Sequence, residues 1–246
     1  SINRMKVLFY KFVGGVICLG AGLSVGREGP SVQMGGCIGE EFSKKGKKPD
    51  YEEVYLTTCG ASAGLSAAFN APMSGVMFAL EEAHKNFSPM ILLSAMIASL
   101  TADCVAKQFF GIIPSLKFNQ LNIMPIKYYW VLIILGIAVG ISGVIFNSGI
   151  LKTQKMFKES KLNRYVKIMI PFFVTGIIGM ISPILTGGGH ELIMELQSTD
   201  FMLMTLVVFL VVKFIFTFVC FGSGVPGGIF FPLLVLGALV GNIVGL

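Results

Sequence analysis

The sequence predicts an all-helical integral membrane protein, on the basis of its composition and the spacing of its apolar segments. Hydrophobic residues make up 54% of the 246 residues and charged residues 13%, whereas an ordinary soluble domain carries about 25% charged residues. The mean hydropathy is +0.79. Apolar runs recur along almost the whole chain, separated by short basic or Gly/Pro-rich breaks. We therefore expect lipid around most of the surface, and a single embedded domain over residues 1–246.

Two kinds of apolar segment are present. A hydrocarbon core of about 30 Å requires about 20 apolar residues per helix, and the segments that meet this length are 7–25, 91–110, 128–150, 165–185 and 201–221. Shorter segments, broken by glycine, proline or asparagine, are 30–42, 54–69 and 72–83. We expect these to be half-helices or re-entrant segments. Backbone breaks at membrane depth are tolerated only inside protein or along a polar cavity, so the short segments indicate a transport pathway.

The net charge of +6 does not indicate a nucleic-acid partner. The basic residues gather in two breaks that lack interleaved aromatic residues for stacking on bases: Lys44, Lys45, Lys47 and Lys48 in one, and Lys152, Lys155, Lys158, Lys161, Arg164 and Lys167 in the other. We expect both to be cytoplasmic loops, following the positive-inside rule. A patch for lipid headgroups or for a partner is the alternative.

No metal site, cofactor or catalytic centre is expected. The five cysteines, Cys18, Cys37, Cys59, Cys104 and Cys220, show no CxxC or Cys/His spacing, and we expect them to be small buried hydrophobes. His84 and His190 stand alone near segment ends. A membrane-embedded enzyme would need a nucleophile with a base, or a metal cluster, and the sequence shows neither pattern. We therefore do not expect an enzyme.

Two breaks share the same arrangement of glycines and proline. The first is Gly26-Arg27-Glu28-Gly29-Pro30, and the second runs from Gly222 to Gly227-Gly228-Ile229-Phe230-Phe231-Pro232. We expect each proline to open a helix, because its missing N–H is no loss in the first turn, and the glycines to let backbone approach a ligand. The N–H groups at a helix start attract anions, so two such starts could converge on one ion. The alternative is that glycine and proline merely kink transmembrane helices.

Taken together, the motifs resemble the CLC chloride channel and transporter family in order and spacing. They are Gly26-Arg27-Glu28-Gly29-Pro30 with Val32-Gln33, Ala67-Ala68-Phe69-Asn70-Ala71-Pro72 leading to Glu81-Glu82, Gly187-Gly188-Gly189, and Gly228-Ile229-Phe230-Phe231-Pro232. The resemblance covers essentially all 246 residues. It implies a multi-helix fold with broken or half-spanning helices and inverted repeats, a pore inside each subunit of a homodimer, and transport of chloride and protons. A bacterial plasma (inner) membrane is the expected location.

The same resemblance implies a chain that is incomplete at both ends. It would begin late in the first repeat, without an initiator methionine, and stop inside the second repeat at Leu246. The family's early Gly-Ser-Gly anion loop and its late tyrosine would then lie outside the chain. Gly222-Ser223-Gly224 looks like the early loop, but it directly precedes the Gly228 motif. We therefore do not expect Ser223 to contact the central ion.

The resemblance also assigns roles to the residues of the two motifs. Glu28 is expected to be the gate, which occupies an anion site when ionised and swings away when protonated. An intramembrane carboxylate is costly and is a functional candidate by default, and the alternative is a structural salt bridge with Arg27 or Lys11. The anion is expected to bind through backbone amides of the motifs, which hold it without trapping it: those of Gly26, Arg27, Glu28, Gly29, Gly228, Ile229, Phe230 and Phe231.

Lys11 and Glu82 complete the expected site. Lys11 would be a buried cation that supports the anion electrostatically, and the alternative is a snorkelling lysine at a membrane edge. Glu82 follows Pro72 by ten residues, about 15 Å of α-helix, which would place it at the cytoplasmic face. The resemblance implies that a glutamate at this position is the internal proton acceptor of the family's exchangers. Its neighbour Glu81 would cap or pair structurally. Glu82 favours chloride/proton exchange over a passive, voltage- or pH-gated chloride channel of the same family.

Overall fold

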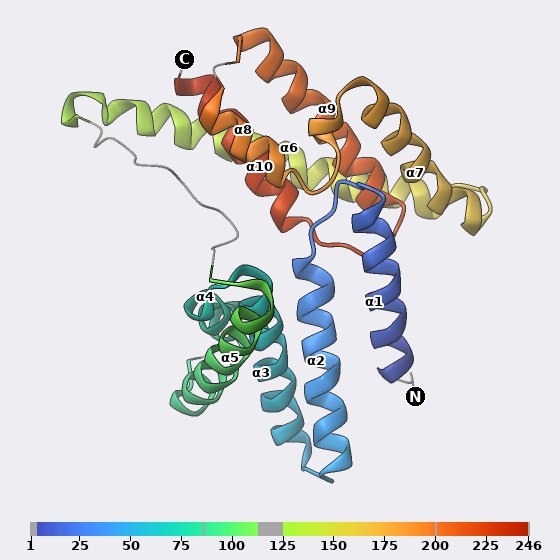
Figure 1. Cartoon of the computed structure of the whole chain (residues 1–246), viewed down its shortest axis with the longest axis vertical. Helices are drawn as coiled ribbons and strands as arrows, with labels where there is room; N and C mark the ends of the chain where they lie inside the picture. Colours follow the sequence, from blue (N-terminus) through green and yellow to red (C-terminus); the bar gives the residue numbers. More distant parts are fainter. Residues whose placement is uncertain (1–3, 86, 113–124, 200, 246) are drawn as a thin grey trace. The chain divides into compact units, whose positions relative to one another are not determined.

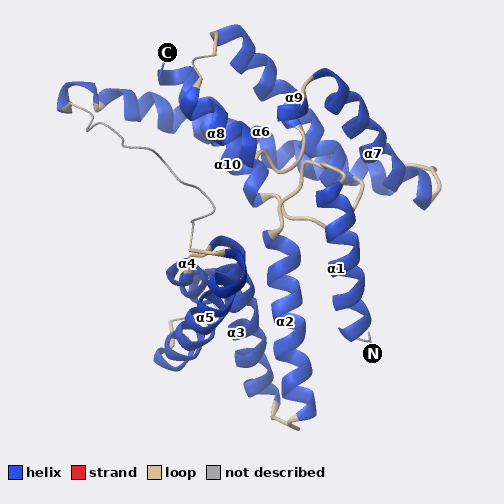
Figure 2. Ribbon diagram, viewed as in Figure 1, coloured by secondary structure: helices blue, strands red, loops and turns tan. Residues whose placement is uncertain are grey.

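The computed structural model describes residues 4–85, 87–112, 125–199 and 201–245, and every regular element within them is a helix (Figures 1 and 2). The predicted all-helical class is confirmed. The chain divides into two compact units, one of Ser1–Val16 with Arg27–Lys117 and one of Ile17–Gly26 with Phe118–Leu246. Helix α1 (Arg4–Gly20) runs from the first into the second. The single embedded domain stays a prediction.

The first unit is built on a pair of helices, α2 (Glu28–Lys45) and α3 (Asp50–Phe69). After α3 the chain continues through the short α4 (Pro72–Phe78), the π-helical turn η1 (Ala79–Ala83) and α5 (Pro89–Phe110). Helix α3 ends where Asn70 adopts a left-handed conformation, with φ of 54°, and Pro72 opens α4. The predicted break at Asn70-Ala71-Pro72 is therefore present.

The apolar segments underestimated the lengths of α2 and α3. The segments 30–42 and 54–69 predicted half-helices, whereas α2 has 18 residues and α3 has 20. Both helices continue into the polar connection between them. Lys44 and Lys45 lie in the last turn of α2, and acidic residues lie in the first turn of α3, which are the signs that the helix dipole favours at those ends.

Glycines allow α2 and α3 to pack with their backbones in contact. A Cβ atom on Gly35 would overlap the backbone of Gly60, and a Cβ atom on Gly60 would overlap that of Gly35. Gly39, four residues after Gly35, lies equally close to the backbone of Leu56. Small residues spaced by four along a helix are typical of close helix pairs in membranes. The first unit therefore depends on these positions having no side chain.

We expect Gly35→Ala to destabilise the full-length protein by about 1–3 kcal/mol, because the added methyl group forces α2 and α3 apart. The matched control is Gly36→Ala on the same helix, whose methyl group would meet the Thr57 side chain at an ordinary 3.6 Å. Thermal unfolding in detergent measures both variants. Equal melting temperatures for the two variants would contradict the backbone contact.

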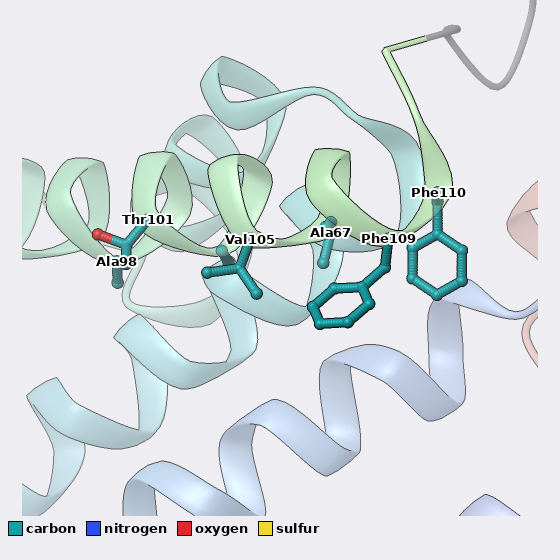
Figure 3. A pocket seen from close by; sticks show the side chains of 8 residues that line it. Ala67, Ala98, Thr101, Val105, Phe109 and Phe110 are labelled. Carbon is teal, nitrogen blue, oxygen red and sulfur yellow. The ribbon is translucent and has the colours of Figure 1, made fainter.

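Hydroxyl groups connect α3 to α5 within the first unit. The Ser62 and Ser99 hydroxyls lie 2.6 Å apart, and the Ser66 hydroxyl donates to the Ser99 carbonyl at 2.8 Å. Nearby, Ala67 of α3 and side chains of α5, including Val105 and Phe109, line an open apolar pocket (Figure 3). The hydroxyl contacts thus lie between α3 and α5, and the apolar side chains line the open pocket beside them.

The second unit contains the longest helices. In chain order they are the 3₁₀ turn η2 (Ile126–Tyr128), α6 (Trp130–Glu159), α7 (Arg164–Ile181), the 3₁₀ turn η3 (Pro183–Leu185), α8 (His190–Ser198), α9 (Leu203–Gly222) and α10 (Phe230–Gly245). Helices α6, α9 and α10 pack together (Figure 1), around a core that includes Phe146, Ile150 and Leu236. A second core joins residues 18–25 to α9 through Leu23, Phe216 and Cys220.

Four helical segments are long and apolar enough to cross a membrane, namely Pro89–Phe110, Ile126–Glu159, Arg164–Ile181 and Leu203–Gly222. Four of the five predicted spans are thereby confirmed by length and composition. Only 6% of the most apolar window of Ile126–Glu159 is buried inside the structure, so its apolar side chains face outward, as lipid-exposed residues do. The fifth predicted span, 7–25, ends at Gly20, because Gly22 adopts a φ of 78° and turns the chain.

The prediction of buried cysteines holds only in part. Cys18, Cys59 and Cys220 are buried, whereas Cys37 is half-buried and Cys104 is exposed. The buried face of α5 carries Asp103, and its neighbour Cys104 lies about 100° away around the helix. Apolar composition identified the segment but not the face that points outward.

Both basic breaks contain ion pairs or helix-terminal contacts. Lys44 lies 2.7 Å from the Glu40 carboxylate, which also pairs with Arg4 of α1. In the second break, Lys167 donates to the Ser160 carbonyl at 2.9 Å, just after the end of α6. These contacts account for part of the charge without a partner. The cytoplasmic orientation of both loops stays a prediction.

Candidate functional site

Within the second unit, the first glycine of the first motif pairs with a glycine of the second motif. The Gly26 N–H donates to the Gly228 carbonyl, and the Gly228 N–H donates to the Gly26 carbonyl, both at 2.8 Å. These bonds form an isolated antiparallel bridge between segments that lie far apart in the sequence. At Gly227 a Cβ atom would overlap the Val25 side chain, so the close approach requires glycine. The bridge pairs one glycine of each motif, and the convergence of the two helix starts on one ion stays a prediction.

Each motif begins its helix two residues after the glycine of the bridge. Helix α2 begins at Glu28 and α10 begins at Phe230. Two residues of chain reach at most about 7 Å, so each helix begins close to the bridge. The sequence predicted that the prolines open these helices, and this prediction is wrong. Each proline occupies the third position of its helix. Pro30 and Pro232 are tolerated there because the first turn of a helix needs no N–H donor from them.

The first intrahelical bonds show which amides lie ahead of each helix. In α2 the Ser31 N–H donates to the Arg27 carbonyl at 3.1 Å, and in α10 the Leu233 N–H donates to the Ile229 carbonyl at 3.0 Å. The amides before these donors point toward the N-terminal end of their helix, where the dipole is positive. The amides of Gly26 and Gly228 already donate across the bridge. The two glycines therefore pair the loops, and the amides that follow them face the helix ends.

Glu28 is buried at the first position of α2, with 5% of its surface exposed. The preceding Arg27 is exposed. The N-terminal end of a helix attracts negative charge, from a carboxylate or from a free anion alike. This arrangement is compatible with the predicted gate, and that role stays a prediction.

The glycine loop before α8 contacts the segment that leads into the first motif and the second motif itself. The Gly187 N–H donates to the Gly22 carbonyl at 2.6 Å. A Cβ atom on Gly188 would lie 3.2 Å from the Val25 carbonyl oxygen and 3.7 Å from the Phe231 ring. Gly187 and Gly189 adopt φ values of 66° and 98°, which favour glycine. The third motif of the sequence therefore packs against the segment that precedes Gly26 and against Phe231 of the second motif.

Lys213 is a buried residue of this region that the sequence reading missed. Its side chain is 0% exposed in the middle of α9, and its ammonium donates to the carbonyls of Leu185 at 3.0 Å and Gly187 at 2.7 Å. The available signal was a single charged residue within an otherwise apolar membrane span, which is a functional candidate by default. Lys11, the cation chosen from the sequence, is only half-buried, so the expectation that it is buried is wrong.

Glu82 lies on the π-helical turn that follows α4, and both it and Glu81 are exposed. The His84 N–H donates to the Ala79 carbonyl at 2.9 Å, an i→i+5 bond. The predicted rise of about 15 Å from Pro72 to Glu82 assumes a continuous α-helix, whereas the chain is π-helical from Ala79 to Ala83. π-Turns occur frequently at functional sites. Glu82 is exposed on this turn, and its role as the internal proton acceptor stays a prediction.

The residues gathered here suit an anion better than a metal. Within the described ranges, no group of three or more His, Cys, Asp or Glu side chains is placed to hold a metal ion. Ser223, which resembled an anion-binding serine, instead donates its hydroxyl to the Cys220 carbonyl at 2.7 Å at the end of α9. The groups available to a ligand are backbone amides at helix starts, with one buried cation nearby in the second unit.

The long apolar helices define an integral membrane protein. A family model described as voltage gated chloride channel matches residues 1–246. The chain belongs to this family, the CLC family.

Individual relatives agree with this assignment. The chain is 37% identical over 252 residues to the H(+)/Cl(−) exchange transporter ClcA of Salmonella typhi and of Salmonella typhimurium, covering 100% of this chain and 53% of each relative. Its structure is similar to that of a slow cyanobacterial Cl⁻/H⁺ antiporter, with a TM-score of 0.88, 32% identity, and coverage of 99% of this chain and 58% of that chain. A CLC-type fluoride/proton antiporter gives a TM-score of 0.79 at 25% identity, covering 94% and 58% of the two chains. The chain spans about half the length of the curated relatives that it matches.

Proposed function

We propose that the protein moves chloride across a membrane in exchange for protons. The observation that carries this proposal is the reciprocal bridge between Gly26 and Gly228, which joins two motifs that each begin a helix two residues later. The relatives named as H(+)/Cl(−) exchangers and antiporters support the same function. A homodimer in a bacterial inner membrane, with both basic loops on the cytoplasmic side and no enzymatic activity, belongs to this proposal.

In the proposed pathway the anion binds to backbone amides. The residues involved are those of the two motifs, Gly26, Arg27, Glu28, Gly29, Gly228, Ile229, Phe230 and Phe231. The glycines of the bridge hold the loops in register, and the amides ahead of the first intrahelical bonds contact the ion. Neutral donors replace part of the hydration shell without the full charge of a cation, which favours release as well as binding.

Proton coupling is proposed to involve two carboxylates. Glu28 competes with the anion when ionised, because both are attracted by the same helix end. When protonated it no longer carries the charge that this end favours, and the anion takes its place. Glu82 takes up protons from the aqueous side on its exposed turn, and water carries them onward. Lys11 contributes positive potential from α1, although it is only half-buried.

A passive anion channel is the second candidate, since the matching family model is described by channel activity. Chloride release from liposomes tests what both candidates share. Liposomes containing the full-length protein and loaded with potassium chloride are expected to release chloride when valinomycin is added. Release no faster than from protein-free liposomes would contradict anion transport by either mechanism.

A further inference from the structure

Lys213 is a buried cation without a carboxylate partner in the part of the chain that the structure describes. None of the ion pairs there includes it, and its ammonium contacts the carbonyl oxygens of Leu185 and Gly187. The Phe216 ring lies 5.7 Å from the ammonium nitrogen. Buried charges are usually paired with an opposite charge. Here the contacts of the Lys213 nitrogen are two carbonyl oxygens and an aromatic ring, and none of them carries a full negative charge.

The Gly187 carbonyl that Lys213 holds belongs to the glycine loop before α8, which contacts the segment leading into Gly26 and the second motif. Gly187 accepts from the ammonium through its carbonyl and donates through its N–H to Gly22. The next residue, Gly188, lies against the Val25 carbonyl and the Phe231 ring. Val25 directly precedes the bridging Gly26, and Phe231 follows the bridging Gly228 by three residues. The Lys213 side chain is therefore connected through one loop to both chain segments that form the bridge.

A second connection runs along the same face of α9. The Thr217 hydroxyl donates to the Lys213 carbonyl at 2.8 Å, and it lies 2.8 Å from the Ser24 hydroxyl. A threonine hydroxyl has one hydrogen, so Ser24 is the donor to Thr217. All of these side chains are buried. The segment before Gly26 is thus attached to α9 at the turn that carries Lys213.

We propose that Lys213 is the positioning cation of the anion site: it holds the glycine loop against the segment that leads into Gly26 and against the second motif, and it supplies positive charge that favours an anion there. This inference rests on the proposed function and adds a residue to it. The charge acts through space, because attraction between charges weakens slowly with distance in a poorly polarisable interior. No carboxylate pairs with Lys213 in the described part of the chain, so a bound anion supplies the opposite charge that stabilises its ammonium form.

The test is chloride binding to the purified full-length protein, measured by isothermal titration calorimetry. Lys213→Met keeps a long side chain and removes both the charge and the hydrogen bonds. We expect it to weaken chloride binding about tenfold, on the order of the contribution of one buried charge. Lys213→Arg keeps the charge and donors, and is expected to restore most of the affinity. The control is Leu206→Ala, a buried position of the same helix, which should lower the melting temperature without changing the affinity for chloride.

The outcomes separate this inference from the function on which it rests. Wild-type protein that binds no chloride contradicts the proposed function itself. Wild-type affinity in Lys213→Met overturns the role of Lys213 and leaves the proposed function intact. If Lys213→Met does not fold, Gly188→Ala decides, because its methyl group would press on Val25 and move the loop while Lys213 is retained. Weaker chloride binding in Gly188→Ala supports the inference, and unchanged binding overturns it.

Discussion

Replacing Glu28 with glutamine is expected to abolish proton movement and to leave chloride movement intact. The amide has the shape of a protonated carboxyl group but cannot release a proton or compete with an anion for the N-terminus of α2. Because Glu28 is buried at the first position of that helix, the substitution places a neutral group where the dipole favours negative charge. Simultaneous recording of chloride and pH outside liposomes that contain the full-length protein measures both fluxes.

A matched control for Glu28→Gln is available on the same helix. Glu41 lies near the other end of α2 and pairs with Lys45 at 3.7 Å, so Glu41→Gln removes a carboxylate from α2 away from the motif. It should transport both ions as the wild type does. Proton transport at the wild-type ratio in Glu28→Gln would remove Glu28 from the role of the gate.

Neutralising Glu82 is expected to stop proton movement while chloride still passes. The carboxylate lies on an exposed turn and can exchange protons with the aqueous phase, while the amides proposed to bind chloride belong to other segments. Glu82→Gln should therefore lose the acceptor that supplies Glu28 and keep the anion path. Proton flux in this variant is expected to fall to the level of protein-free liposomes, measured with a pH electrode under a chloride gradient.

The neighbouring glutamate provides the control for this second experiment. Glu81 is exposed on the same π-turn, so Glu81→Gln makes the same chemical change one residue away. Both ions should move in that variant at wild-type rates. If Glu81→Gln and Glu82→Gln lose proton transport equally, the turn matters as a whole and Glu82 has no individual role as the acceptor.

The features that the sequence predicted are those that depend on composition and local chain geometry. The apolar length of 201–221 predicted α9 to within a few residues, because a bilayer imposes that length on any helix that crosses it. The glycines and prolines marked the positions where helices begin, and the backbone bridge formed between the two glycines of the motifs. The two helices begin two residues earlier than the prolines predicted, since a helix can begin before a proline as well as at it.

The features that it missed depend on which face of a helix meets which neighbour. Gly35 and Gly39 form a small-residue pattern that is visible in the sequence, but only the structure shows Gly60 opposite Gly35. The burial of Lys213 and the partial exposure of Lys11 likewise depend on packing, because both lysines lie within apolar helices. The π-turn at Glu82 leaves no pattern that hydrophobic periodicity can detect. The resemblance to a family predicted the roles of individual residues. Only the structure shows how deeply those residues are buried and which groups they contact.

Uphill proton movement driven by chloride tests the proposed exchange most directly. Liposomes that contain the full-length protein and a high internal concentration of potassium chloride are placed in a low-chloride solution at the same pH, with valinomycin to dissipate the membrane voltage. An exchanger is expected to carry protons inward as chloride leaves, so the external pH rises until a protonophore returns it to its starting value. Chloride release without any change in external pH would contradict exchange and support a passive anion channel.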